Sequence, residues 1–180
     1  MHKKNKKQTL HAKDILIPAF ALFLICLVVA GAMAGVNALT QKSIEENEQI
    51  TAAASREAMF PGAEFETVQD NCFAAHQDGA LAGYVIETEA QGYGGPIQIA
   101  VALDPEGSIR QLQILAADSE TPGLGQKVKE ESFLRQFAGK QSASLDGIDA
   151  VASATISSSG VVNAVNEAIE IYKSMGGGAQ

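Results

Sequence analysis

The chain opens with a long apolar stretch that is followed by a charged, Gly- and Pro-free segment. Residues 15–36 contain no charged side chain. At about 1.5 Å rise per residue, a helix of this length crosses a hydrocarbon core about 30 Å thick. The pattern therefore predicts a single transmembrane helix over 15–36. A cleaved signal peptide is the alternative, because small residues at 30–34 resemble a cleavage site, although the stretch exceeds the usual apolar core of about 7–15 residues.

The segment after the apolar stretch has the composition of a helix. Residues 43–58 are rich in Glu and Ala, include Gln49, and contain neither Gly nor Pro, which favours helix. Met-Phe-Pro-Gly at 59–62 ends it. We expect a solvated helical stalk over 37–60 and a folded domain over 61–175, with a flexible tail at 176–180.

The first half of that domain shows the alternation of strands. Residues 81–89 are rich in strand-forming side chains, and branched residues at 97, 99, 101 and 103 alternate with Gln or Ala, which is the period of a half-buried strand. Asp-Pro-Glu-Gly at 104–107 suits a type I turn. Residues 109–115 then return as the partner strand of a hairpin.

The second half of the domain favours helices. Residues 126–138 are predicted to form a helix with an apolar side supplied by Val128, Phe133, Leu134 and Phe137, and Gly139 ends the segment. A final helix is predicted over 158–175, where apolar residues recur at helical spacing. Strands and helices do not alternate regularly, so the fold class is α+β, with an antiparallel sheet and flanking helices.

Composition and charge narrow the function. A chain of 180 residues with 46% hydrophobic and 19% charged residues fits one folded domain with appendages. Residues 1–14 carry five lysines and one aspartate, a charge of +4 against −8 for the whole chain, so the remainder carries −12. The acidic bulk argues against nucleic-acid binding. The basic tail over 1–14 predicts a cytoplasmic N-terminus in a cell (inner) membrane, with the domain extracytoplasmic or periplasmic.

Hydrolytic and metal chemistry find little support. Cys26 lies in the predicted span and Cys72 outside it, and neither belongs to a Cys-x-x-Cys motif, which argues against iron–sulfur, haem c or zinc sites made by this chain alone. Cys72 and His76 would share one side of a helix if 71–77 were helical, a spacing that we interpret as incidental. Glu87 and Glu89 alternate on a predicted strand, and we interpret them as a solvated face.

The stretch Asp-Ala-Val-Ala-Ser-Ala-Thr at 149–155 carries the most specific chemistry. Thr155 lies just ahead of the predicted final helix, and Ser157, Ser158 and Ser159 are candidate N-caps. Free backbone N–H groups and the positive end of the helix dipole stabilise a phosphate at such a place. From these residues alone, a Ser/Thr-rich helix start without a ligand remains the alternative.

Two Gly-rich loops precede this stretch. In Glu-Thr-Pro-Gly-Leu-Gly at 120–125, Pro122 favours extended backbone at Thr121, while Gly123 and Gly125 allow conformations that other residues resist. Taken alone, Pro-Gly-x-Gly indicates only a turn. Gly-Tyr-Gly-Gly at 92–95 is either the entry to a hairpin or a loop beside a ligand.

These motifs, together with the N-terminal apolar segment, resemble the G subunits of Rnf electron-transport complexes over nearly the whole chain. In that family an Asp, two variable residues, Ser or Thr, Gly, Ala and Thr form the motif that flavin transferases recognise, and the final Thr takes FMN through a phosphoester. Asp149, Ala154 and Thr155 match it. Ala152 and Ser153 stand where Ser or Thr and Gly are usual. If the Gly position requires left-handed backbone, Ser153 costs about 1–2 kcal/mol.

The resemblance implies the site residues. FMN would be covalently attached to Thr155, and Asp149 would serve recognition by the flavin transferase or Mg²⁺-assisted transfer. No residue is implied as catalytic or as a metal ligand of the mature protein. The other implied cofactor contacts are Glu120, Thr121, Gly123, Leu124, Gly125, Ser153, Ala154, Ile156 and Ser157.

The resemblance also implies the function. The chain would carry electrons in a membrane complex that moves them between reduced ferredoxin and NAD and couples this to Na⁺ or H⁺ transport. It would be one component of a translocase rather than a stand-alone enzyme. Its expected partners are the other membrane and peripheral Rnf subunits, membrane lipid, and a flavin transferase during maturation. Two alternatives stay open: the C subunit of the Na⁺-translocating NADH:quinone reductase, and a non-redox, membrane-anchored structural module.

Overall fold

A computed structural model describes residues 12–176 of the chain. Most of the predicted basic tail and residues 177–180 of the predicted flexible tail lie outside the described residues. The chain divides into two compact units, Met1–Asn47 and Glu48–Gln180. Each unit is described separately below.

The helix α1 (Ala12–Met59) supplies the described part of the first unit. It is long and apolar enough to cross a membrane, by length and composition. Its large apolar side chains are exposed from Ile15 to Leu39. A helix that exposes apolar side chains all round has no stable surroundings in water, whereas lipid provides them. The helix therefore contains the membrane-spanning candidate that the apolar stretch predicted.

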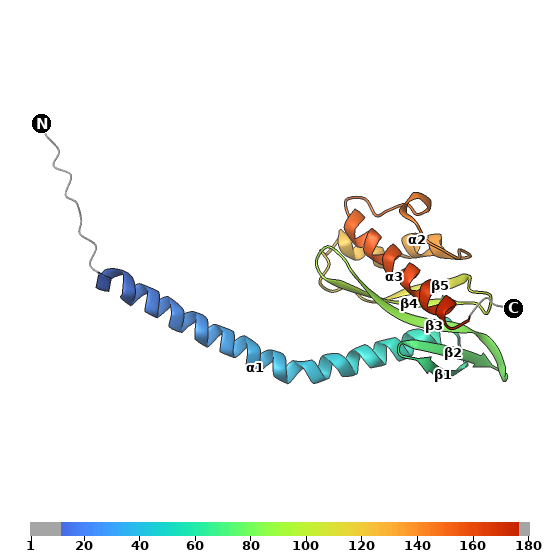
Figure 1. Ribbon diagram of the computed structural model, residues 1–180, viewed down its shortest axis with the longest axis horizontal. Coiled ribbons are helices and arrows are strands. Elements are labelled where there is room, and N and C mark those ends of the chain that lie inside the picture. The colour runs from blue at the N-terminus through green and yellow to red at the C-terminus, as the bar shows by residue number, and fades with distance from the viewer. Residues whose placement is uncertain (1–11, 177–180) are drawn as a thin grey trace, which may run out of the picture. The chain divides into compact units, whose positions relative to one another are not determined.

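The second unit is built on a five-stranded antiparallel sheet in which the strands follow one another in chain order (Figure 1). The predicted strands over 81–89, 97–103 and 109–115 are confirmed. The α+β class with an antiparallel sheet is therefore confirmed. The strands are β1 (Glu64–Gln69), β2 (Cys72–Gln77), β3 (Ala80–Gln91), β4 (Pro96–Leu103) and β5 (Ile109–Ala116).

The first hairpins of the sheet were not predicted. The connection from β2 to β3 is Asp78-Gly79, and both residues have positive φ, 52° and 79°, as a type I′ hairpin turn requires. The helix considered over 71–77 is therefore wrong, because residues 72–77 form the strand β2. Cys72 is buried, which raises the pKa of its thiol to about 11 and leaves it un-ionised at neutral pH.

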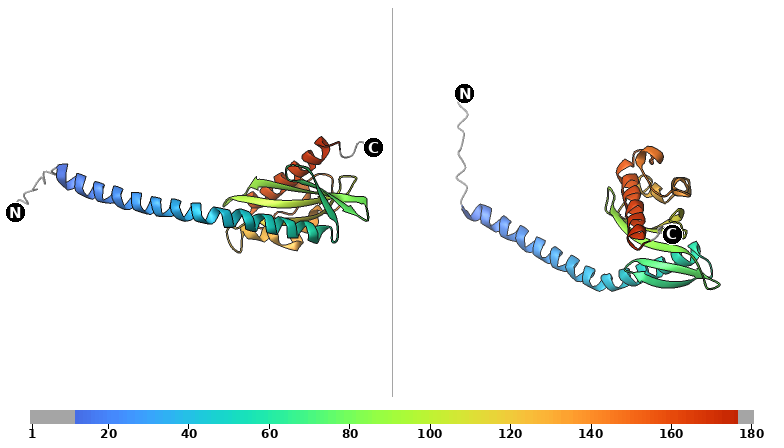
Figure 2. Two further views of the ribbon diagram at one scale, coloured as in Figure 1. Left: turned by 90° about the horizontal axis from the view of Figure 1, so that it is seen from below. Right: turned by 45° about the vertical axis from the view of Figure 1, so that its right-hand side comes forward.

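Both faces of the sheet are covered. The helix α3 (Thr155–Ser174) packs on the face that carries branched side chains such as Ile99 and Val101, and the last turns of α1 lie on the opposite face (Figure 2). Ala100 and Ala102 on that second face are fully buried. The prediction of a half-buried strand was therefore wrong, because Ala leaves room for a helix to approach the sheet closely.

The last turns of α1 belong to the folded domain. Ala52, Ser55 and Met59 are buried against the sheet, and the Ser55 hydroxyl donates to Oε1 of Gln113 at 2.9 Å. The second compact unit accordingly begins at Glu48. This differs from the solvated stalk expected over 37–60, since the end of that segment is an anchoring helix.

The predicted helix over 126–138 is broken into three short pieces. In one continuous helix Val128 and Phe133 would point about 140° apart, because each residue turns the helix by about 100°. Both side chains are buried in the core, and an extended residue, Glu130 (ψ 135°), interrupts the helix between them. The pieces are η1 (Gly125–Lys129), α2 (Glu131–Leu134) and η2 (Arg135–Phe137), and η3 (Leu145–Gly147) follows before α3.

Candidate functional site

Thr155 is the first residue of α3, three residues earlier than the predicted start of that helix. The N-cap position is Ala154, which has no side chain able to bond the free N–H groups of the first turn. Thr155 itself is exposed. The start of α3 therefore combines an accessible hydroxyl with backbone donors that no cap side chain occupies.

None of the three serines that follow acts as an N-cap, so this prediction was wrong. Ser157 and Ser158 are buried inside the first turn. The Ser158 hydroxyl donates to the carbonyl of Ala154 at 3.0 Å and accepts from the N–H of Val151 at 3.0 Å. The Ser159 hydroxyl donates to the carbonyl of Thr155 at 2.8 Å. The two Ser158 bonds tie the preceding segment to the helix instead, whereas the Ser159 bond lies within the helix.

A buried carboxyl group lies beneath the start of α3. Glu120 is only 1% exposed. Its Oε2 accepts from the Ser157 hydroxyl at 2.6 Å, and its Oε1 accepts from the N–H of Gly94 at 3.0 Å. A Cβ on Gly92 or Gly125 would come within 2.2 or 2.1 Å of these oxygens. Close packing against Glu120 therefore requires glycine at position 125, in addition to the turn that the motif predicted.

The segment before Thr155 contains a left-handed residue. Ser153 has φ 61°, and the N–H of Ala154 donates to the carbonyl of Val151 at 2.9 Å to close the turn. The resemblance places Gly at position 153. Because the backbone is left-handed there, Ser153 costs about 1–2 kcal/mol relative to Gly. Gly123 is also left-handed, with φ 74°.

A cavity of about 560 Å³ opens beside Thr155. Its lining includes every predicted cofactor contact except Gly123, at which an added Cβ would meet nothing within 4 Å. The positive φ of Gly123 serves the turn of its loop, and its position is off the cavity wall. The lining residues are Tyr93, Glu120, Thr121, Leu124, Gly125, Ser153, Ala154, Thr155, Ile156 and Ser157.

Tyr93 is the lining residue that was missing from the predicted contacts. It lies in the connection between β3 and β4 and is 71% exposed. The Gly-Tyr-Gly-Gly loop is therefore both a hairpin connection and a wall of the cavity. Glycines on both sides of a lone aromatic residue were the available signal, since they let the loop approach Glu120 closely.

Asp149, the predicted recognition residue, does not line the cavity. It is exposed, and among the described residues its carboxylate has no hydrogen bond or ion pair. Its backbone is held by the side-chain amide of Gln136, which accepts from the Asp149 N–H at 2.7 Å and donates to the Asp149 carbonyl at 3.1 Å.

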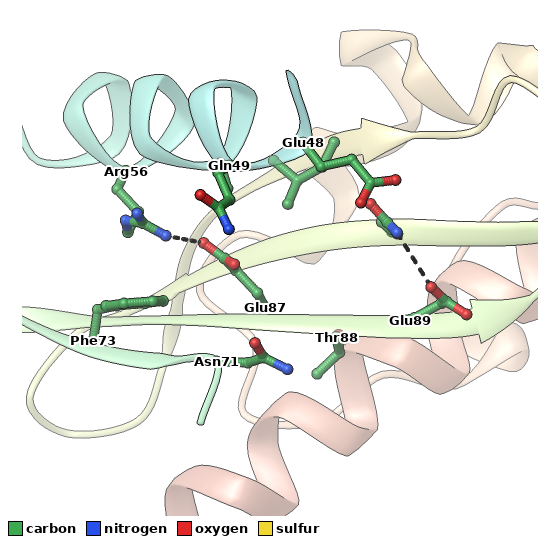
Figure 3. A pocket seen from close by; sticks show the side chains of 11 residues that line it. Glu48, Gln49, Arg56, Asn71, Phe73, Glu87, Thr88 and Glu89 are labelled. Carbon is green, nitrogen blue, oxygen red and sulfur yellow. Dashed lines mark hydrogen bonds and ion pairs between the residues drawn. The ribbon is translucent and has the colours of Figure 1, made fainter. Parts of the chain in front are cut away.

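A second cavity, of about 470 Å³, lies between the last turns of α1 and the sheet and contains none of the predicted site residues (Figure 3). Arg56 of α1 forms an ion pair with Glu87 of β3 there, and its guanidinium lies 4.0 Å from the centre of the Phe73 ring. Only 17% of each ion-pair side chain is exposed. The interpretation of a solvated face is therefore wrong for Glu87, although Glu89 is exposed.

Comparisons with known families separate the chain into two matched regions. The profile of the FMN-binding domain matches residues 92–170. The profile of the RnfG N-terminal region matches residues 4–57. The first region contains the whole cavity beside Thr155, and the second contains most of α1.

Curated relatives extend over much of the chain. The G subunit of the proton-translocating ferredoxin:NAD(+) oxidoreductase complex from Clostridium ljungdahlii is 35% identical over 59% of this chain and 62% of its own length. The G subunit of the Na(+)-translocating ferredoxin:NAD(+) oxidoreductase complex from Acetobacterium woodii is 28% identical over 86% and 89%. The G subunit of the ion-translocating oxidoreductase complex from Stutzerimonas stutzeri is 30% identical over 84% and 78%.

Solved structures give partial matches. The C subunit of the Na(+)-translocating NADH-quinone reductase from Parabacteroides distasonis is 24% identical, covers 57% of this chain and 60% of its own, and has a TM-score of 0.47. NqrC from Shewanella oneidensis is 26% identical, covers 53% and 52%, and has a TM-score of 0.47. Both matches span little more than half of either chain.

Proposed function

This chain belongs to the family of G subunits of ion-translocating oxidoreductase complexes, and from that premise we propose that it is a membrane-anchored electron carrier with FMN esterified to Thr155. One observation carries the proposal. The exposed Thr155 stands at a helix start without a side-chain cap and beside a cavity of about 560 Å³. An anchored acceptor hydroxyl, free N–H donors and space for a ring thus meet at one place.

The residues present fit FMN. The cavity lies within the range of about 300–1,000 Å³ usual for small-molecule sites. Tyr93, Leu124 and Ile156 are exposed apolar side chains on its lining, suited to contact an aromatic ring system. The first-turn N–H groups of α3 would stabilise the phosphodiester charge next to Thr155. A tether also keeps the cofactor from diffusing away outside the membrane.

The lining explains why attachment needs a separate transferase. Esterification joins Thr155 Oγ1 to the FMN phosphorus, and it requires an activated FMN donor such as FAD, from which AMP leaves as the phosphoanhydride breaks. The hydroxyl proton needs an acceptor. Glu120 is the one carboxyl group of the lining, and both its oxygens already accept hydrogen bonds. The transferase would therefore supply the base and the Mg²⁺, and would recognise the exposed Asp149.

The attached FMN would supply the redox chemistry, while the chain fixes its position and its exposure to solvent. By its family, the chain would work with the other membrane and peripheral subunits of a complex that couples electron flow between ferredoxin and NAD to Na⁺ or H⁺ transport. The apolar part of α1 would be the lipid anchor, spanning residues 15–36. The N-terminus would be cytoplasmic and the domain extracytoplasmic.

The proposal is tested by removing the acceptor hydroxyl. The full-length chain is co-produced with a flavin transferase, denatured, and viewed for flavin fluorescence on a gel. Thr155→Val, which keeps the shape and deletes the hydroxyl, should abolish the signal, and Thr155→Ser should retain part of it. Thr67→Val, which removes an exposed hydroxyl from β1, should change nothing. Fluorescence that persists in Thr155→Val would place the attachment elsewhere, and a dark wild-type chain would favour the structural module.

The topology is tested separately with a thiol label. Ser174 is exposed at the end of α3. In a Cys72→Ser background, a Ser174→Cys variant should react with a membrane-impermeant thiol reagent in intact cells or spheroplasts. Labelling that occurs only after lysis would put the domain on the cytoplasmic side.

A further inference from the structure

Gln136 makes a two-point contact with the start of the acceptor segment at 149–155. It lies in η2, next to Phe137, which is fully buried and fixes this piece to the core. The Gln136 amide accepts from the N–H of Asp149 at 2.7 Å and donates to the carbonyl of the same residue at 3.1 Å. One side chain thus satisfies both backbone groups of Asp149, as a neighbouring strand would.

The rest of the acceptor segment is hydrogen-bonded toward its other end. The N–H of Val151 donates to the Ser158 hydroxyl at 3.0 Å, and the turn from Val151 to Ala154 then leads into α3. Ser153 in that turn is left-handed, a conformation that costs a non-Gly residue free energy. The strained turn is therefore bracketed by Ser158 on one side and by Gln136 on the other.

We propose that Gln136 is a positioning residue for flavin attachment: it fixes the backbone of Asp149 so that the exposed Asp149 carboxylate and the Thr155 hydroxyl are presented to the transferase as one rigid unit. This inference rests on the proposed attachment of FMN to Thr155. The contact engages only the backbone of Asp149, so the exposed carboxylate remains available to the transferase. Pre-organisation of this kind lowers the ordering cost that binding would otherwise incur.

The chain offers a matched control for a general structural effect. Asn166 of α3 makes the same two-point contact with another segment, because its amide accepts from the N–H of Ala143 at 3.0 Å and donates to the Ala143 carbonyl at 2.8 Å. Ala143 is not part of the acceptor segment. Loss of the Asn166 contact loosens a loop of the same domain without touching the residues that the transferase would read.

The experiment measures attachment rates on the full-length chain in detergent, produced without transferase. Purified flavin transferase, FAD and Mg²⁺ are added, and initial rates of gel fluorescence are recorded against acceptor concentration. Gln136→Ala should raise the KM for the acceptor about 10-fold with kcat within about twofold, since two hydrogen bonds that order the segment are lost. Gln136→Glu, which still accepts from the Asp149 N–H, should give an intermediate KM. Asn166→Ala should leave the KM within about twofold.

A double-mutant cycle shows whether Gln136 acts through Asp149. In an Asp149→Ala background, which lacks the presented carboxylate, Gln136→Ala should have no further effect on the KM. An unchanged KM for Gln136→Ala, an equal rise for Asn166→Ala, or additive effects in the cycle would each overturn the inference and leave the FMN attachment intact. A wild-type chain that takes up no FMN in this assay would overturn the proposed function, and the inference with it.

Discussion

Two glutamates, the partly buried Glu87 and the fully buried Glu120, are held in different ways. Glu87, on the α1 face of the sheet, pairs with the cationic Arg56 (Figure 3). Glu120, beneath the start of α3, has no ion-pair partner among the described residues and accepts instead from the Ser157 hydroxyl and the Gly94 N–H. The first contact joins one helix to one strand, whereas the second joins three segments that surround a cavity.

The difference distinguishes a contact that anchors α1 from a contact that shapes a ligand site. On the α1 face the helix approaches an alanine-lined sheet, so the ion pair and the buried Ala100 fasten the last turns of α1 to the domain. Around Glu120 the neighbours are glycines and hydroxyls, which leave space on the other side of the loop for a ligand. We therefore expect changes at Glu87 to alter stability alone and changes at Glu120 to alter both stability and the flavin site.

The largest effect is expected for Glu120→Ala. It leaves the Ser157 hydroxyl and the Gly94 N–H without their acceptor and opens a cavity, so the free energy of unfolding should fall by about 3 kcal/mol. Attached FMN should also show a shifted absorption spectrum. Thermal unfolding of the full-length chain by circular dichroism measures the first effect. Glu89→Ala, an exposed carboxylate on β3, is the control and should change stability by less than about 0.5 kcal/mol. A small loss for Glu120→Ala would contradict the role assigned to its carboxyl group.

A smaller effect is expected for Arg56→Ala. It leaves Glu87 without its cation and removes the contact with Phe73, at a cost of about 2 kcal/mol in the free energy of unfolding. The flavin spectrum should not change, because this face does not line the cavity beside Thr155. Arg110→Ala serves as control, since Arg110 lies 4.9 Å from the Phe60 ring and forms no ion pair among the described residues. A flavin shift in Arg56→Ala alone would show that the two faces are coupled.

The smallest effect is expected for Ser153→Gly. Gly adopts φ 61° without the side-chain penalty, so stability should rise by about 0.5–1 kcal/mol after the entropy cost of Gly is included. Attachment of FMN should also become faster. Asn71→Gly changes another left-handed position, φ 59°, but Asn tolerates this conformation well, and its gain should be smaller. Equal gains at both positions would mean that the acceptor turn carries no special strain.

The sequence predicted the elements whose patterns are local. The alternation at 97–103 and the turn at 104–107 identified β4 and its hairpin with β5, and the apolar stretch at 15–36 lies within α1. The hairpin of β1 and β2 was missed because its strands carry many polar and small residues, and the Asp78-Gly79 turn marks only the end of β2 and the start of β3. The packing of α1 on the sheet was missed because alanine alternating with branched residues has the pattern of a half-buried strand, although Ala100 and Ala102 are buried under α1.

The motifs predicted the residues of the candidate site better than the hydrophobic periodicity did. The resemblance named the residues of two distant loops, and the structure brings nine of them together beside one cavity. It could not show that Glu120 is buried and bonded to Ser157, because this contact depends on the exact approach of α3 to the loop at 120–125. The role of Gln136 was equally hidden, since a bond from one side chain to the backbone of Asp149 leaves no pattern in the sequence.

The central claim, that Thr155 carries FMN, is tested most directly by locating the added mass. Trypsin cuts after Lys140 and Lys173 and releases one peptide, residues 141–173, that contains Thr155 and several serines. The full-length chain, modified by a flavin transferase in its native membrane, should yield this peptide with the mass of one FMN less one water. Fragmentation should place that mass on Thr155. An unmodified peptide, or a modification located on one of its serines, would contradict the account.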